Sequence, residues 1–465
     1  MPIETTPPET TSNVQTSSSQ RLWIKSPLAT LDASSAGGVV VKNDLIVEVL
    51  TAGQQPSQPV DTVFDASEHV LLPGLINAHH HFYQTLTRAF PAALNKELFP
   101  WLKSLYPVWA RLNAEMIEVS TQIALSELLL SGCTTASDHH YLFPDGLEQA
   151  IDIQMQQAQI LGVRVHLTRG SMSLGEDDGG LPPQTTVQSA DTILADSERL
   201  IGLYHDKRDG AMTRVALAPC SPFSVSEALM RDSAELARQH DVRLHTHLAE
   251  THDETAFCQQ MFGVRPLDYL ERVGWLTDRT WLAHGIHFDD DEIKRLGAAG
   301  TGIAHCPSSN MLLASGQCKT LDLEAAGSPV GLGVDGSASN DCSNMMQEVR
   351  QAFLLQRLRY GASKITHQKV FNWATEGSAR CLGRDDIGKL EVGKQADLAM
   401  FRLDDIRYAG AGDPLAALVL CGAEKADRMM VAGRWRVIDS TICGVDMPQL
   451  LARQRELAAQ LARSH

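Results

Sequence analysis

Three consecutive histidines give the first indication of chemistry in this sequence. His79, His80 and His81 lie at the end of an apolar run. In an extended segment, side chains two positions apart point the same way, so His79 and His81 can converge on one ion while His80 faces away. Imidazole nitrogens suit Zn²⁺, and Fe²⁺ and Mn²⁺ are alternatives.

Further candidate ligands stand at the ends of later apolar runs. His245 and His247 share one face of residues 243–249, and Glu250 follows directly. His284 and Asp335 end two other runs. A single histidine is most often structural or exposed, but several at the carboxyl ends of separate strands are typical of a barrel active site. Taken together, these positions predict a metal site.

The elements that must position these residues alternate through the middle of the chain. Helical patterns at residues 115–130 and 147–161 separate apolar runs, and another at 344–359 follows the last run. Eight such units over about 300 residues are typical of a (β/α)₈ barrel of the TIM type, with a doubly wound sheet as the structural alternative. The expected strands are residues 71–77, 134–138, 164–168, 214–219, 243–249, 281–284, 302–305 and 330–335.

The two ends of the chain differ from the middle in their predicted secondary structure. Short β-like runs separated by turn residues occupy residues 21–72 and 386–445, which we expect to form one small β-sandwich domain. The barrel would then occupy residues 73–385, and a C-terminal helix residues 446–465. Residues 1–20 are rich in Ser, Thr and Pro, so a disordered tail is expected there.

Composition limits the classes of partner. The chain has 465 residues and a formal net charge of −16, which disfavours nucleic acid and anionic membrane surfaces as partners. No apolar stretch approaches the roughly 20 residues that span a bilayer. The nine cysteines are scattered without a CxxC pair, and no secretory signal is recognisable. These features predict a cytoplasmic protein.

The order and spacing of the candidate residues resemble those of the amidohydrolase superfamily. The resemblance covers nearly the whole chain and implies that His79, His81, His247 and Asp335 hold one divalent metal ion, Zn²⁺ or alternatively Fe²⁺. Members with two metals usually carry a carboxylated lysine at the end of the fourth strand. That strand ends here in LAPC at residues 217–220, which favours the mononuclear aminohydrolase branch. The motifs that carry the resemblance are GLINAHHH at residues 74–81, HLAE at 247–250, His284 and Asp335.

The resemblance implies hydrolytic deamination of a heterocycle. A bound metal lowers the pKa of water from 15.7 to about 7, so that metal-bound hydroxide can attack a ring carbon near neutral pH. Asp335 would accept the proton of that water, and His284 would stabilise charge as the tetrahedral centre forms. Glu250 would protonate the neighbouring ring nitrogen and then pass a proton to the leaving amine.

Within the superfamily, the sequence is similar to deaminases that act on 8-oxoguanine and guanine. Residues 79–88 carry this similarity, whereas residues 131–140 and 305–310 are shared with triazine hydrolases and adenosine-type deaminases. The resemblance implies conversion of 8-oxoguanine into uric acid and ammonia. The alternatives are deamination of guanine, S-adenosylhomocysteine or methylthioadenosine, and removal of chloride or an alkylamine from a triazine. A small heterocyclic substrate and a homo-oligomeric enzyme are expected.

Five side chains near the metal motif are candidate substrate contacts. Gln84 could bind a purine edge through its amide, and the aromatic residues could stack on a flat ring. The arginine could bind a carbonyl group. Packing inside a loop or a salt bridge is the alternative for each of them. The candidates are Gln84, Trp101, Trp109, Tyr141 and Arg169.

One motif is set aside. Residues 331–336 read GLGVDG and match the dinucleotide signature G-x-G-x-x-G, which would indicate an oxidoreductase. A true signature opens a helix directly, but here a polar Ser/Asn segment follows. We interpret these residues as the eighth barrel strand, which delivers Asp335.

Overall fold

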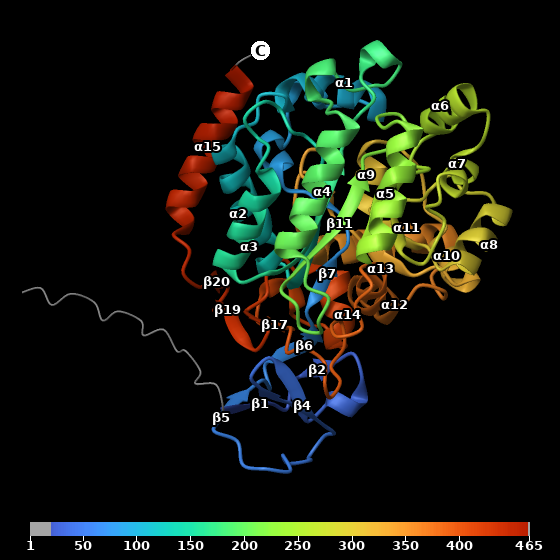
Figure 1. Cartoon of the computed structure of the whole chain (residues 1–465). Coiled ribbons are helices and arrows are strands. Elements are labelled where there is room, and N and C mark those ends of the chain that lie inside the picture. Colours follow the sequence, from blue (N-terminus) through green and yellow to red (C-terminus); the bar gives the residue numbers. More distant parts are fainter. Residues whose placement is uncertain (1–19, 464–465) are drawn as a thin grey trace, which may run out of the picture.

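The computed structural model describes residues 20–463, in which a barrel stands on a smaller β-sheet domain (Figure 1). The barrel sheet has eight parallel strands in the order β15-β14-β13-β12-β11-β10-β9-β7, so strands adjacent along the chain are neighbours in space. Each predicted run falls on one of them. The strands are β7 (Leu75–Asn77), β9 (Cys133–His140), β10 (Arg164–Ser171), β11 (Thr213–Pro219), β12 (Arg243–Leu248), β13 (Thr280–His284), β14 (Gly302–His305) and β15 (Val330–Leu332).

A short pair of strands joins the first and last barrel strands. The Ala78 N–H donates to the Leu332 carbonyl at 2.9 Å. Beyond this bond, β8 (His80–His81) pairs in parallel with β16 (Asp335–Gly336), with Asp335 opposite His80. The sheet therefore closes at the position of the histidine motif, as expected for a (β/α)₈ barrel, and the doubly wound alternative is wrong.

Helices cover the outside of the barrel, and local sequence explains where several of them begin. The barrel strands are buried on both faces, as in other parallel sheets, which accounts for their continuous apolar runs. Asn113 caps α2, and Asp289 forms a capping box with Glu292 at the start of α8. The helices are α2 (Ala114–Leu130), α3 (Ala150–Leu161), α4 (Ala190–Tyr204), α5 (Glu227–His240), α6 (His252–Phe262), α7 (Pro266–Arg272), α8 (Asp290–Ala299), α9 (Pro307–Leu312), α10 (Thr320–Ala326), α11 (Met345–Tyr360), α12 (His367–Asn372) and α13 (Ser378–Cys381).

The first and last predicted strands need correction. Residues 71–73 belong to β6 (His69–Pro73) of the small domain, and the barrel strand starts only at Leu75. Gly74 lies between the two strands. A larger residue does not fit at this position, because a Cβ there would lie 2.1 Å from Thr134 Oγ1. The last strand ends at Leu332, and Asp335 adopts a positive φ of 61° instead of an extended conformation.

The small domain combines both ends of the chain in two sheets. One sheet is N-terminal, in the order β4-β3-β1-β5, and the other has the order β2-β6-β17-β18-β19-β20. Ile24, Val41, Leu71, Leu398 and Met430 pack into one core between them. The strands are β1 (Arg21–Lys25), β2 (Ala29–Thr30), β3 (Gly38–Lys42), β4 (Leu45–Leu50), β5 (Thr62–Asp65), β17 (Leu398–Arg402), β18 (Arg428–Val431), β19 (Arg434–Ile438) and β20 (Thr441–Ile442).

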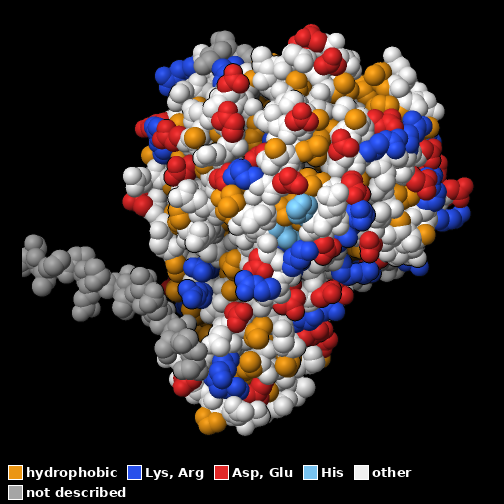
Figure 2. All heavy atoms as spheres, in the orientation of Figure 1, with side chains coloured by type: hydrophobic (Ala, Val, Ile, Leu, Met, Phe, Trp, Pro, Cys, Tyr) orange, Lys and Arg blue, Asp and Glu red, His pale blue; other side chains and the backbone are white. Residues whose placement is uncertain are grey.

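The chain ends in a long amphipathic helix, α15 (Met447–Arg463), which lies along α2 (Figure 1). Leu450, Leu457 and Leu461 are its buried face. Acidic and basic side chains are interspersed over the face shown in Figure 2. Within residues 20–463, no helix is long and apolar enough to cross a membrane. The predicted tail, apart from Gln20, lies outside the described residues. Assembly into a homo-oligomer stays a prediction.

Candidate metal and catalytic site

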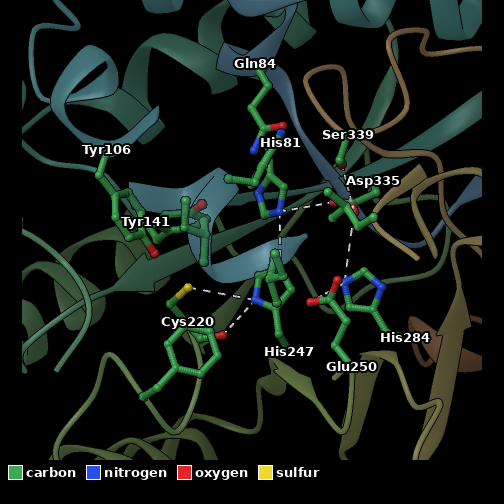
Figure 3. Close-up of a pocket in the computed structure, with 15 residues that line it drawn as sticks. His81, Gln84, Tyr106, Tyr141, Cys220, His247, Glu250, His284, Asp335 and Ser339 are labelled. Atoms are coloured by element: carbon green, nitrogen blue, oxygen red, sulfur yellow. Dashed lines mark hydrogen bonds and ion pairs between the residues drawn. The ribbon is translucent and has the colours of Figure 1, made fainter. Parts of the chain in front are cut away.

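Three imidazoles and one carboxylate converge at the carboxyl ends of the barrel strands. Figure 3 shows three of these groups, those of His81, His247 and Asp335. His79 Nε2 and His81 Nε2 each lie 3.3 Å from Asp335 Oδ1. His247, which β12 supplies, places its Nε2 3.2 Å from that of His81. All four side chains are buried. Groups from three separate parts of the chain therefore share one small volume.

Backbone carbonyls fix the direction of two of these rings. His81 Nδ1 donates to the carbonyl of His139 at 2.7 Å, and His247 Nδ1 donates to that of Cys220 at 2.7 Å. Each ring therefore turns an unprotonated Nε2 towards the centre. His80 points elsewhere, with Nε2 2.8 Å from Ser343 Oγ. The predicted alternation of the three consecutive histidines is confirmed.

The donor set fits one divalent cation. His79 Nε2 is buried and lacks a hydrogen-bond partner among the described residues. Burial lowers the pKa of His247 to about 3 and that of His79 well below its usual value, so both rings stay neutral, the form that binds metal. Burial alone would raise the pKa of Asp335, but the neighbouring imidazoles of His79 and His81 outweigh it and hold that pKa well below its usual value.

A second carboxyl group and a fourth imidazole stand beside this cluster. Glu250 Oε2 lies 3.5 Å from His284 Nε2, which is 4.0 Å from Asp335 Oδ2. Ser315 Oγ donates to the other Glu250 oxygen at 3.4 Å. Burial raises the pKa of Glu250, which favours its protonated form. The arrangement provides a proton donor and a proton acceptor on either side of one imidazole.

The segments that carry these groups hold unusual backbone conformations. Ala249, His284 and Asp335 have φ values of 54°, 71° and 61°. Such left-handed residues cost about 1–3 kcal/mol each when they are not glycine, and they gather at functional sites. His284 is also fixed by its Nδ1, which donates to Asn310 Oδ1 at 2.9 Å. Its Nε2 is thereby left free to face Glu250.

A cavity opens beside these groups. His81, Glu250, His284 and Asp335 border one part of it (Figure 3). Neutral side chains border the remainder, and several of them are aromatic. They include Gln84, Trp101, Tyr106, Tyr141, Cys220 and Phe223.

Two of the five predicted substrate contacts do not line the cavity. Trp109 is fully buried in the core, where its Nε1 donates to Thr87 Oγ1 at 3.2 Å. Arg169 forms an ion pair with Asp196 at 2.5 Å and stacks on Phe143. Trp109 therefore packs in the core and Arg169 forms a salt bridge, which are the alternatives to a substrate contact.

The long segment after β8 is partly helical and supplies one wall of the cavity. It contains a 3₁₀ helix (Phe82–Thr87) followed by α1 (Leu98–Trp109). Trp101 and Tyr106 of α1 face the cavity, whereas Phe82 and Tyr83 are buried in the core. This segment is therefore both a pocket wall and additional core.

Comparison with known proteins gives the family. Residues 70–441 match the amidohydrolase family. The chain belongs to that family. It is 66% identical to 8-oxoguanine deaminase of Pseudomonas aeruginosa, over 95% of this chain and 99% of that protein. It is 40% identical to hydroxydechloroatrazine ethylaminohydrolase of a Pseudomonas species, over 78% of this chain and 77% of that one. Atrazine chlorohydrolase from Arthrobacter aurescens, solved with zinc, superimposes with a TM-score of 0.89 at 30% identity, covering 94% of this chain and all of that one.

The glycines of the set-aside motif have a packing function in this amidohydrolase. A Cβ on Gly333 would lie 2.7 Å from the Cβ of His79, and one on Gly336 would lie 1.8 Å from Gln84 Oε1. The segment can thus pass close enough to the histidine motif to bring Asp335 between His79 and His81. The dinucleotide interpretation is wrong.

Sequence reasoning missed several residues of the site. Asn310 orients His284, and Ser339 Oγ donates to Asp335 Oδ2 at 3.2 Å. Cys220 and Tyr106 line the cavity. Asn310 ends the segment 305–310 that is shared within the family, so a signal was present for it. No sequence pattern indicated that Ser339, Cys220 and Tyr106 would reach the site, because their positions depend on how the chain folds.

Proposed function

We propose that this amidohydrolase converts 8-oxoguanine and water into uric acid and ammonia. The observation that carries the proposal is the Glu250–His284 pair beside the histidine and aspartate cluster. It occurs in a chain that is 66% identical to an 8-oxoguanine deaminase over nearly its whole length. In the reaction a C–O bond forms at C2, the exocyclic C–N bond breaks, and one water molecule is consumed.

His79, His81, His247 and Asp335 would hold one divalent ion, which we propose to be Zn²⁺. Three imidazole nitrogens with a carboxylate oxygen are a ligand set that zinc uses in catalytic sites. A zinc ion bound there supplies water with a pKa of about 7 as a nucleophile near neutral pH. The zinc in the atrazine chlorohydrolase structure supports the assignment.

Asp335 and His284 handle the proton and the charge of the attacking water. The Asp335 carboxylate would take the proton as the C–O bond forms, because its Oδ1 lies 3.3 Å from His79 Nε2 and its Oδ2 lies 4.0 Å from His284 Nε2, next to the position of the attacking water. His284, held by Asn310 at Nδ1, hydrogen-bonds the nucleophile through Nε2. As an acceptor this Nε2 orients the nucleophile, and by taking up a proton the ring would stabilise charge as C2 becomes tetrahedral.

Glu250 supplies the acid that a deamination requires. Attack at C2 moves an electron pair onto the adjacent ring nitrogen N3, and a proton from Glu250 prevents anionic charge there. Glu250 then takes the hydroxyl proton of the tetrahedral centre and passes it to the exocyclic amine, which leaves as neutral ammonia as the C–N bond breaks. The proton held by Asp335 restores the Glu250 carboxylic acid. Loss of chloride from a triazine needs no such proton, so a buried acid at this place favours deamination.

Neutral side chains would bind the purine. Gln84 Oε1 accepts from the Ala338 N–H at 3.2 Å, which leaves its amide N–H groups to donate to a substrate oxygen. Trp101 Nε1 donates to the Ala338 carbonyl at 3.1 Å, so this indole offers its apolar ring. Tyr141 lines the same cavity and can contribute a hydroxyl group.

A substrate panel with ammonia detection tests the proposal. We expect kcat/KM for 8-oxoguanine to exceed that for guanine, isoxanthopterin, S-adenosylhomocysteine and hydroxylated or chlorinated triazines. Turnover of an adenosine derivative or a triazine without turnover of 8-oxoguanine would overturn the substrate assignment. Release of chloride or alkylamine as the main reaction would overturn the deaminase assignment.

Loss of the Asn310 side chain should reduce turnover through His284. In Asn310→Ala the buried imidazole N–H loses its acceptor, which costs about 1–3 kcal/mol. We expect kcat to fall about 10–100-fold, since each 1.4 kcal/mol is a factor of ten, with KM much less affected. Ser309→Ala is the matched control, because Ser309 is buried on the same helix and its hydroxyl has no hydrogen-bond partner within residues 20–463. Equal kcat values for the two variants would contradict the role of Asn310.

A further inference from the structure

We infer that His245 is a positioning residue, which fixes the orientation and the protonated nitrogen of His79. The inference rests on the metal-binding role proposed for His79. His245 is fully buried in β12, does not line the cavity and takes no part in the proposed reaction. Its ring contacts His79, which does not line the cavity either.

The hydrogen bonds of His245 determine which nitrogen of His79 carries a proton. His245 Nδ1 lies 2.8 Å from the carbonyl oxygen of Trp281, which can only accept, so this nitrogen donates. The other nitrogen, Nε2, then has the free electron pair and accepts from His79 Nδ1 at 2.8 Å. His79 therefore presents an unprotonated Nε2 towards Asp335, as a metal ligand must.

Trp281 completes a closed unit around His79. Its indole stacks on the His245 ring, with centroids 4.4 Å apart and planes at 15°. Its Nε1 donates to the carbonyl of Ala78 at 3.0 Å, and Ala78 directly precedes His79. The Trp281 side chain thus holds the backbone before His79, while the Trp281 carbonyl holds the ring through His245. Neighbouring strands β12 and β13 locate the ligand in this way.

His79 differs in this respect from the other two imidazoles. Backbone carbonyls orient His81 and His247, whereas a side chain orients His79. A single substitution can therefore remove the support of His79, while the supports of the other two are part of the main chain.

The same hydrogen bonds exclude a second metal ion between His79, His139 and His245. Nitrogens of His79, His139 and His245 come within 4.8 Å of one another. However, the bonds described above use His79 Nδ1 and both nitrogens of His245. His139 Nε2 donates to the Ala218 carbonyl at 2.8 Å, which leaves only Nδ1 of this ring. One free nitrogen cannot hold a metal ion. His79, His139 and His245 therefore do not form a second metal site, and His245 instead orients His79.

Three substitutions at position 245 separate the two hydrogen bonds. His245→Leu removes both of them. His245→Asn can still donate to the Trp281 carbonyl but is too short to reach His79. His245→Gln places an amide oxygen near the position of Nε2 and can again accept from His79. The readout is the Kd of the metal-free protein for Zn²⁺, measured by competition with a chromophoric chelator.

We expect zinc binding to weaken about 10–100-fold in His245→Leu and His245→Asn, and to recover most of this loss in His245→Gln. His305→Leu is the matched control, since His305 is equally buried at the end of β14, two strands away in the same sheet, and contacts Gln356. Thermal unfolding of the metal-free proteins checks that each variant folds. Should His245→Leu misfold, the comparison of Asn with Gln still decides.

Two results would overturn the inference. One is a Kd for the Leu and Asn variants within twofold of the unmodified chain. The other is equal weakening in His305→Leu, which would assign the effect to general loss of packing. Failure of the unmodified chain to bind Zn²⁺ would instead overturn the proposed metal site and this inference with it. Normal zinc binding without turnover of 8-oxoguanine would overturn only the proposed substrate.

Discussion

Replacing Glu250 with glutamine is expected to lower kcat for 8-oxoguanine about 10²–10⁴-fold, the range for loss of a general acid. Glutamine has nearly the same shape and can keep the contact with Ser315, but it cannot deliver a proton to the ring nitrogen or to the amine. Glu250 faces His284 and is not part of the ligand set, so the variant should keep its metal. Steady-state ammonia release and metal analysis of the same preparation measure both.

Glu254→Gln provides the matched control for this experiment. Glu254 is equally buried and lies four residues further on, but it accepts hydrogen bonds from the backbone N–H groups of Ala249 and Glu250 instead of facing the cavity. An amide oxygen can still accept one of those bonds, so we expect less than a tenfold change in kcat. Near-normal turnover in Glu250→Gln would contradict the acid role. A loss of the same size in both variants would show that the effect comes from a changed conformation of residues 249–254, which carry both carboxyl groups.

Local periodicity sufficed for the barrel strands and for the alternation of the three consecutive histidines. Two-residue spacing placed His79 and His81 on one face and His80 on the other, and the folded chain keeps that arrangement. The ends of the strands are less well determined. An apolar run does not show where one sheet ends and another begins, so one strand was expected over residues 71–77, where β6 of the small domain and β7 of the barrel are separate strands.

Arg169 and Trp109 show that the sequence does not determine the direction in which a long side chain turns. An arginine at the end of a strand can turn towards the cavity or towards a neighbouring helix, and the carboxylate of Asp196 decides the direction of Arg169. Trp109 was likewise drawn into the core by contacts made far along the chain, including Tyr83 and Trp101. Tertiary neighbours of this kind leave no periodic signal near the residue they affect.

Glutamine at position 81 should abolish zinc binding, whereas glutamine at position 80 should not. Both histidines are buried and adjacent, so the two variants make the same chemical change at nearly the same place. His81 Nε2 points at Asp335 and His247, but His80 Nε2 points at Ser343. We expect His81→Gln to lose bound metal and turnover together, and His80→Gln to retain about one Zn²⁺ per chain, as a mononuclear site requires.

Thermal unfolding with and without added Zn²⁺ gives an independent measure of the same difference. A ligand that binds only the folded state at 100 times its Kd adds about 2.7 kcal/mol to stability. The unmodified chain and His80→Gln should therefore gain several degrees in Tm when zinc is added to the metal-free protein, and His81→Gln should gain nothing. His80→Gln can start from a lower Tm, because its bond to Ser343 changes. An equal zinc-dependent rise in both variants would show that the ion binds without His81, and the ligand set proposed for this barrel would then be wrong.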